Sequence, residues 1–216
     1  HEDHIGAIGW LWPRLRAPIY ATPFTAYLVA EKLRERGLAE EADLRIMQLR
    51  EKRQFGPFEV EMVTLTHSIP EPNGLAIRTP LGLILHTGDW KIDADPLIGE
   101  DFDQAKIEEL GREGILAMVC DSTNVFAEGE AGSEGSARTA LIQAVAEQTG
   151  RVAITSFASN VARVQSACEA AKMNSRSVCL GGRSMLRIVG AAESVGMLKG
   201  YSLMEPEDAA NLPHEN

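Results

Sequence analysis

The first four residues, His-Glu-Asp-His, constrain the fold most, because the architecture must accommodate three potential metal ligands in one short stretch. A neutral imidazole offers a nitrogen lone pair and a carboxylate offers hard oxygens, a mixture that suits zinc or manganese. The apolar run after them, with Gly6 and Gly9, predicts that the ligands lie on a tight loop that leads into a helix, whose N-terminus would face the site. On this stretch alone, a metal site competes with an exposed polar start and with a residual purification sequence.

Two further potential ligands follow predicted strands. His67 comes directly after the strand expected at 58–65, and Asp89 comes after the strand expected at 83–86, in the sequence His-Thr-Gly-Asp-Trp-Lys. Loops at strand ends commonly display the residues of functional sites. Each of these two residues alone suits an ordinary loop, but with the opening cluster they form one candidate set: His1, Asp3, His4, His67 and Asp89.

The remaining pattern predicts a strand-rich first part and a second part in which strands and helices alternate. Further elements of the first part are expected to be strands at 18–21, 44–49, 75–78 and 115–120 (the last one buried, with Cys120 at its end), a short helix or turn at 8–15, and helices at 23–36 and 103–110. A Gly/Glu-rich boundary at 128–134 precedes helices at 137–148, 161–171 and 185–195 and strands at 152–156 and 177–180. This alternation is typical of a parallel sheet. The end of the chain, 206–216, shows no regular pattern, and His214 within it is expected to be exposed.

Composition narrows the class of protein. Of the 216 residues, 44% are hydrophobic, which supports a folded core, and the net charge of −10 argues against a general nucleic-acid binder without excluding a local basic groove. Three widely spaced cysteines, Cys120, Cys168 and Cys179, predict reduced thiols in a cytoplasmic protein. No apolar run reaches the ~18–20 residues of a membrane span. Because residue 1 is not Met, we expect a fragment that begins inside the opening motif.

These motifs together resemble the ribonuclease J family, of the β-CASP group in the metallo-β-lactamase superfamily. The similar stretches are His-Glu-Asp-His-Ile-Gly-Ala, Thr-His-Ser-Ile-Pro-Glu, His-Thr-Gly-Asp-Trp-Lys-Ile-Asp, Cys-Asp-Ser-Thr-Asn, Phe-Ala-Ser-Asn and Gly-Arg-Ser-Met. The resemblance covers nearly the whole chain and implies an α/β fold. Residues 1–131 would form a partial, N-terminally truncated metallo-β-lactamase αββα sandwich. Residues 132–216 would be the first part of an inserted βαβ-type β-CASP domain, truncated at its C-terminal end.

The resemblance also implies two divalent metal ions, with zinc expected first and manganese or magnesium as alternatives. His1 and His67 would share one ion and Asp3 and His4 the other, with Asp89 bridging both and further histidines absent from this sequence. Asp3 would also be catalytic, orienting the attacking water or accepting its proton.

Two supporting roles are implied as well. Asp121 would act in catalysis by hydrogen bonding to the site, unless it only caps its own loop through Ser122 and Thr123. The RNA 5′ end would bind at the stretch Phe157, Ala158, Ser159 and Asn160. A helix cap at Ser159 or Asn160 is compatible with that binding role.

The implied function is a two-metal hydrolase that cleaves RNA phosphodiester bonds. It would be a 5′-to-3′ exonuclease on 5′-monophosphate RNA, with endonuclease activity as well, in rRNA processing and mRNA decay. The expected partner is single-stranded RNA, and the full-length protein is expected to form a homodimer or homotetramer with no membrane attachment, whereas the fragment alone should be weak or inactive. Three alternatives stay open: a related nuclease acting on DNA or at mRNA 3′ ends, another lactamase-fold hydrolase such as a thioesterase, and a non-catalytic scaffold paralogue in an RNA-degradation complex.

Overall fold

The computed structural model describes residues 1–212, which form two compact units. Unit 1 comprises residues 1–67, 71–94 and 99–130, and unit 2 comprises residues 68–70, 95–98 and the chain from 131 onward. The main division thus falls in the Gly/Glu-rich stretch, while the predicted domain bounds stay a prediction. His214 lies outside the described residues.

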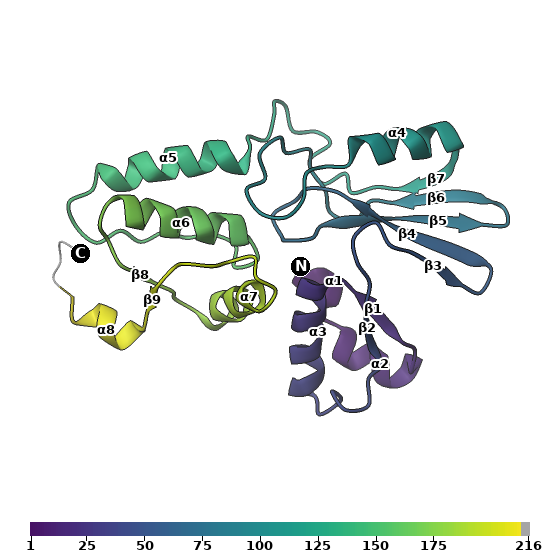
Figure 1. The fold of residues 1–216 in the computed structure, drawn as a ribbon, viewed down its shortest axis with the longest axis horizontal. Coiled ribbons are helices and arrows are strands. Elements are labelled where there is room, and N and C mark those ends of the chain that lie inside the picture. The colour runs from purple at the N-terminus through teal and green to yellow at the C-terminus, as the bar shows by residue number, and fades with distance from the viewer. Residues whose placement is uncertain (213–216) are drawn as a thin grey trace. The chain divides into compact units, whose positions relative to one another are not determined.

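A mixed five-stranded sheet, in the order β3-β4-β5-β6-β7, organises unit 1 (Figure 1). Four strands pair antiparallel, namely β3 (Lys52–Phe55), β4 (Phe58–Thr64), β5 (Asn73–Thr79) and β6 (Gly82–His86). The fifth, β7 (Ile115–Val119), lies parallel to β6. The predicted hairpin between β5 and β6 is confirmed.

One face of this sheet packs under helix α4 (Gln104–Glu113). The fully buried side chains of this core are Val63, Leu65, Ala76, Leu83, Leu85 and Leu110. The carboxylate of Asp103 accepts a hydrogen bond from the Lys106 N–H at 3.0 Å and so caps the helix N-terminus. The cap begins the helix that carries Leu110 into the core.

The rest of unit 1 is a smaller α/β layer. It contains α1 (Glu2–Ile5), α2 (Ile8–Leu15), α3 (Pro23–Glu35) and the parallel pair β1 (Ile19–Ala21) and β2 (Leu44–Ile46). Helix α3 begins as predicted, with Thr22 as N-cap residue and Pro23 as its first residue, where the missing N–H of proline has no helical partner. Trp12, Val29 and Leu33 form the buried core of this layer.

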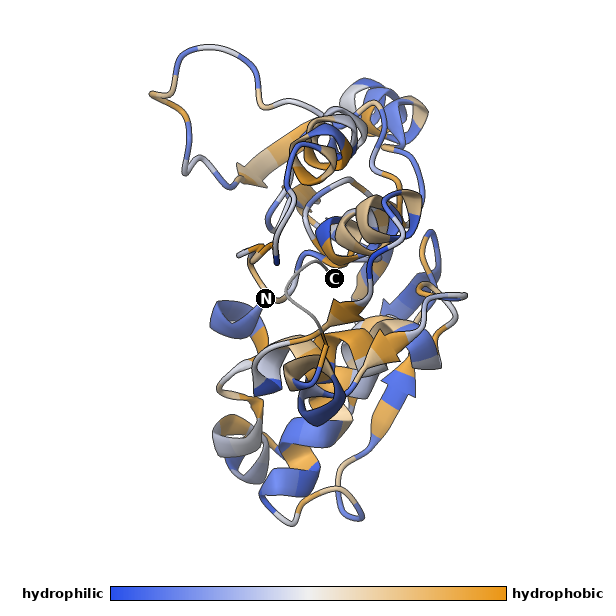
Figure 2. Cartoon of the chain, turned by 90° about the vertical axis from the view of Figure 1, so that its left-hand side faces the viewer, coloured by the Kyte–Doolittle hydropathy of each residue, from blue (hydrophilic) through white to orange (hydrophobic). Residues whose placement is uncertain are grey.

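Unit 2 is mainly helical. Helix α5 (Glu134–Ala146) packs against α6 (Val161–Met173), and α7 (Arg183–Ser194) and α8 (Pro206–Ala210) follow. The parallel pair β8 (Val178–Cys179) and β9 (Leu203–Met204) is the only sheet among the described residues of this unit. The predicted α/β class is confirmed, whereas the αββα sandwich stays a prediction. Figure 2 shows hydrophobic residues concentrated on strands and a mixture of both kinds along the helices.

Several sequence predictions about unit 1 were wrong, and one strand was missed. The opening motif is not a loop, because Glu2–Ile5 is a helical turn with His1 as its N-cap residue. Strand β7 is an edge strand rather than a buried one, with Leu116 64% exposed, and Cys120 after it is only partly buried. Strand β3 was missed because its sequence, Lys-Arg-Gln-Phe, is mostly polar, and β2 is shorter than expected.

Two predictions about unit 2 were also wrong. Residues 152–156 form no strand, since a strand needs a hydrogen-bonded neighbour and none of the described strands pairs with this segment. Val152 is 37% exposed and Ile154 is 40% exposed there. The segment after 206 contains a short helix, α8, which starts at a proline. Within residues 1–212, the helices all fall short of the length and apolar character that crossing a bilayer requires.

Candidate metal centre

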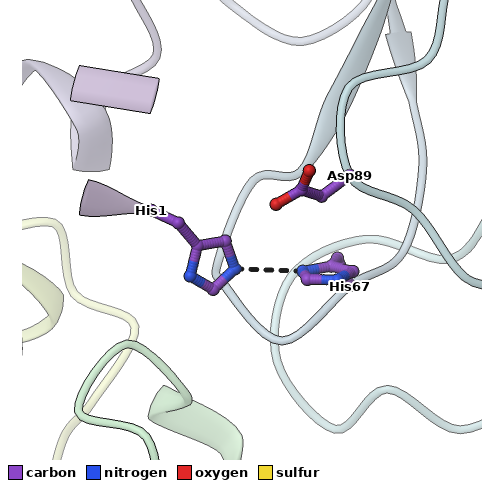
Figure 3. Close-up of side chains that lie close together, drawn as sticks. All are labelled: His1, His67 and Asp89. Carbon is purple, nitrogen blue, oxygen red and sulfur yellow. Dashed lines mark hydrogen bonds between the residues drawn. The ribbon is translucent and has the colours of Figure 1, made fainter. Parts of the chain in front are cut away.

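Five side chains from separate parts of unit 1 converge into two triads that share Asp89. One triad is His1, His67 and Asp89, and the other is Asp3, His4 and Asp89. In each triad one potential ligand atom per residue lies within 4.8 Å of the others. Figure 3 shows the first triad, with the two rings and the carboxylate turned toward a common point. The structure thus brings together all five of the predicted ligand residues that this sequence contains.

The closest contacts join atoms that bind metal ions in proteins. The His1 Nε2 and His67 Nδ1 atoms are 3.1 Å apart, and the His4 Nε2 atom lies 3.1 Å from an Asp89 carboxylate oxygen. The same His4 nitrogen is 3.5 Å from an Asp3 oxygen. The first triad offers two nitrogens and one oxygen, and the second offers one nitrogen and two carboxylates. Both donor sets fit zinc or manganese, so the residues present suit the implied metal ions.

Exposure and charge further suit the triads to a reactive site. The side chain of Asp3 is 76% exposed and that of His4 is 46% exposed, so a large substrate can reach them. Burial lowers the pKa of His67, and the nearby Asp89 carboxylate opposes this effect only in part. A lowered pKa keeps the imidazole neutral, with a lone pair available for a cation. His86, at the end of β6, accepts a hydrogen bond from the Gly88 N–H at 3.1 Å and belongs to neither triad.

Asp121 contacts the Asp89 segment through its main chain. Its N–H donates to the Thr87 hydroxyl at 3.1 Å, and its carbonyl accepts from the Trp90 indole at 3.3 Å. The Asp121 carboxylate instead accepts from the Thr123 hydroxyl at 2.6 Å and the Thr123 N–H at 2.9 Å, and these bonds lower its pKa. The loop cap expected at Thr123 is therefore present, and the Asp121 main chain braces the Asp89 segment.

The predicted RNA-binding stretch lies in unit 2, before α6. Phe157 is 84% exposed, and Ala158 and Ser159 are partly buried. Asn160 is only 8% exposed: its side-chain oxygen accepts from the Arg163 N–H at 2.9 Å, and its side-chain nitrogen donates to Glu134 at 3.2 Å. Asn160 thus caps α6 and connects it to α5, which leaves Phe157 as the exposed ring of this stretch.

Two buried residues beside the ligands were not singled out from the sequence. Thr66 immediately precedes His67, and Asp93 ends the motif that contains Asp89. Both are at least 95% buried, and the Asp93 N–H donates a hydrogen bond to the Thr66 hydroxyl at 3.1 Å. The sequence could have pointed to Asp93, because it is a second aspartate in the same motif as Asp89.

The family model and the curated relatives that match this chain name one family. Residues 149–216 match the family described as "Ribonuclease J, beta-CASP domain". Ribonuclease J of Sinorhizobium meliloti is 45% identical over 208 residues, which cover 96% of this chain and 37% of that protein. Ribonuclease J of Corynebacterium glutamicum is 41% identical over 100% of this chain and 30% of its own length. Ribonuclease J of Thermus thermophilus is 38% identical over 96% of this chain and 38% of its length.

These coverages mean that the chain spans about a third of the length of the relatives it matches. Among solved structures, "Crystal Structure of a Protein of Unknown Function from Enterococcus faecalis V583" matches with a TM-score of 0.66 and 16% identity. That match covers 92% of this chain and 52% of the other. It supports the arrangement of helices and strands and says nothing about chemistry.

Proposed function

The chain belongs to the ribonuclease J family, as its motifs predicted, and we propose that unit 1 supplies the metal-binding part of a ribonuclease active site. The observation that carries this proposal is the pair of triads that share Asp89. Because the chain spans about a third of its relatives, the activity is proposed for the full-length protein.

Each ligand has a specific role in this proposal. His1, His67 and Asp89 would hold one divalent ion, and Asp3, His4 and Asp89 would hold the other, with zinc expected and manganese or magnesium as alternatives. When bound, two such ions would supply Lewis acidity toward a phosphodiester and would lower the pKa of a water molecule. Asp3, the more exposed of the two ligand carboxylates, would orient that water and accept its proton.

The substrate would be single-stranded RNA, degraded from a 5′-monophosphate end in the 5′-to-3′ direction, with internal cleavage as a second activity. The exposed ring of Phe157 would stack on a base, and the Ser159 hydroxyl would contact a phosphate. By the same resemblance, the full-length protein would act in the cytoplasm as a homodimer or homotetramer, in rRNA processing and mRNA decay.

The test uses the full-length protein and 5′-labelled single-stranded RNA that carries either a monophosphate or a triphosphate. Asp89→Asn removes the shared ligand, and Asp101→Asn makes the same change at an exposed aspartate outside both triads. We expect mononucleotides from the monophosphate RNA with the wild-type protein and the Asp101 variant. The Asp89 variant should release none and should bind fewer metal ions.

Other outcomes would redirect the proposal. Cleavage at internal sites alone, again lost in the Asp89 variant, would indicate an endonuclease that uses the same ligands. A folded wild-type protein that binds no metal ion and cleaves no RNA would contradict the nuclease proposal and favour a scaffold.

A further inference from the structure

The segments that carry His67 and Asp89 are joined by one buried threonine. Thr66, which is 1% exposed, pairs with Lys91 in an isolated antiparallel bridge. The Lys91 N–H donates to the Thr66 carbonyl at 2.8 Å, and the Thr66 hydroxyl donates to the Lys91 carbonyl at 2.5 Å. The same hydroxyl accepts from the Asp93 N–H at 3.1 Å. The Thr66 hydroxyl therefore donates one hydrogen bond and accepts another, both with the segment that presents Asp89.

A buried ion pair adds to this connection. The Asp93 side chain is 0% exposed, and one of its oxygens lies 2.8 Å from the Lys91 Nζ atom. A buried carboxylate is costly unless a cation and hydrogen bonds compensate it. The pair therefore strongly favours one conformation of residues 91–93, directly after the predicted shared ligand.

The other end of the same segment is also held. The Thr87 N–H donates to the Val119 carbonyl at 3.0 Å, and the Thr87 hydroxyl accepts from the Asp121 N–H at 3.1 Å. Gly88 adopts a left-handed conformation with φ +60°, which glycine reaches without steric cost. Asp89 thus stands on a short segment whose backbone is fixed on both sides.

We propose that Thr66, Lys91 and Asp93 form a clamp that positions Asp89 opposite His67 before a metal ion binds. The clamp touches neither substrate nor reacting atoms, so its members are positioning residues. This inference rests on the proposed metal-binding function. If the clamp acts in this way, metal affinity depends on the Thr66 hydroxyl even though that hydroxyl is not a ligand. Without the clamp, metal binding would also have to order the Asp89 segment, and this would reduce the affinity.

The chain offers a matched pair of variants for the test. Thr64 lies two residues before Thr66 and is equally buried at 1% exposure, but within residues 1–212 its hydroxyl has no hydrogen-bond partner. In the full-length protein, Thr66→Val should lower zinc affinity, measured by competition with a chelator, by about tenfold or more. Thr64→Val should bind zinc like the wild type. Thr66→Ser, which keeps the hydroxyl, should restore most of the affinity.

A second measurement requires no metal ion. In the metal-free protein, the amide hydrogen of Asp93 should exchange faster in Thr66→Val than in Thr64→Val, because only Thr66 accepts a bond from it. Asp93→Asn keeps the shape of the side chain and weakens the ion pair, so it should lower zinc affinity by a smaller factor even if Thr66→Val folds poorly.

The outcomes separate the clamp from the proposed function. If the wild type binds zinc and cleaves RNA while Thr66→Val and Thr64→Val behave alike in both measurements, the clamp is refuted and the metal centre stands. If the wild type binds none of zinc, manganese and magnesium, the metal centre fails and the clamp fails with it.

Discussion

Arg78 connects two strands and a helix of unit 1 through carboxylates, and replacing it by methionine should destabilise the sheet. From β5, its Nη1 atom donates to Glu61 at 2.8 Å and to Glu59 at 3.1 Å, both on β4. Its Nε and Nη2 atoms each donate to Glu113 on α4 at 2.7 Å. Glu61 is the critical partner because its side chain is only 3% exposed.

The size of the effect follows from what remains around Glu61. In Arg78→Met, the buried carboxylate keeps Lys106 at 3.1 Å and Lys52 at 3.3 Å. Removing one partner of a buried ion pair costs about 3–5 kcal/mol when the other charge is left uncompensated. Because two ammonium groups remain, we expect a lower value, about 2–3 kcal/mol, by the same reasoning. A loss of that size would raise the population of the opened state, and with it the rate of amide exchange in the sheet, by roughly 30- to 150-fold.

The assay is amide hydrogen exchange of β4 and β5 in the full-length protein. The control is Arg112→Met, which removes an arginine that is 72% exposed and 3.9 Å from Glu108, and should change nothing measurable. The double variant Arg78→Met/Glu61→Leu should exchange more slowly than Arg78→Met alone, because it also removes the buried charge. This account would be refuted if Arg78→Met and Arg112→Met exchanged at the same rate. It would also be refuted if the double variant lost the sum of the stabilities lost by Arg78→Met and Glu61→Leu.

Three further predictions concern pH, RNA binding and thiol chemistry. Burial raises the pKa of Glu61, but hydrogen bonds from its arginine and lysine partners outweigh this and leave it below its usual 4.5. The stability that Glu61 contributes is therefore present above pH 4.5 and lost as the pH falls through the folded-state pKa. The melting temperature should therefore fall as the pH drops below 4.5, and it should fall less in Glu61→Gln. Phe157→Ala should weaken single-stranded RNA binding by about 1–3 kcal/mol with an unchanged melting temperature, whereas Phe126→Ala, at a ring 95% exposed in unit 1, should leave binding intact. Burial raises the pKa of Cys168 to about 11, so iodoacetamide near pH 8 should modify the exposed Cys179 and spare Cys168, as read by mass spectrometry.

The elements that could be predicted are those in which local chemistry determines the conformation. Thr22 followed by Pro23 predicts a helix start in any surroundings, and the structure confirms it. The turn between β5 and β6 likewise follows from proline and glycine between two apolar runs. The proximity of the five candidate ligands could be predicted because few side chains bind metal ions and each of the five stood in a motif.

The elements that could not be predicted depend on neighbours that are distant in sequence. The apolar run 115–119 indicates a strand, but it does not show which elements will cover that strand. In the structure, the strand is β7 and lies at the edge of the sheet. The polar strand β3 forms because β4 offers it a hydrogen-bonding partner, while the apolar segment 152–156 has none among the described strands. Pairing, rather than composition, decided both cases.

The same limit applies more sharply to the residues that support the candidate metal centre. Thr64 and Thr66 are the same residue two positions apart, both 1% exposed, and no periodicity or propensity rule separates them. One hydroxyl has no hydrogen-bond partner among the described residues, and the other makes two hydrogen bonds to the segment that presents Asp89. Ligands are recognisable in a sequence because their chemistry is rare, but positioning residues are common side chains whose role comes only from where the fold places them. If Thr66→Val and Thr64→Val differ in zinc affinity, that difference measures what tertiary placement adds to two residues of identical chemistry.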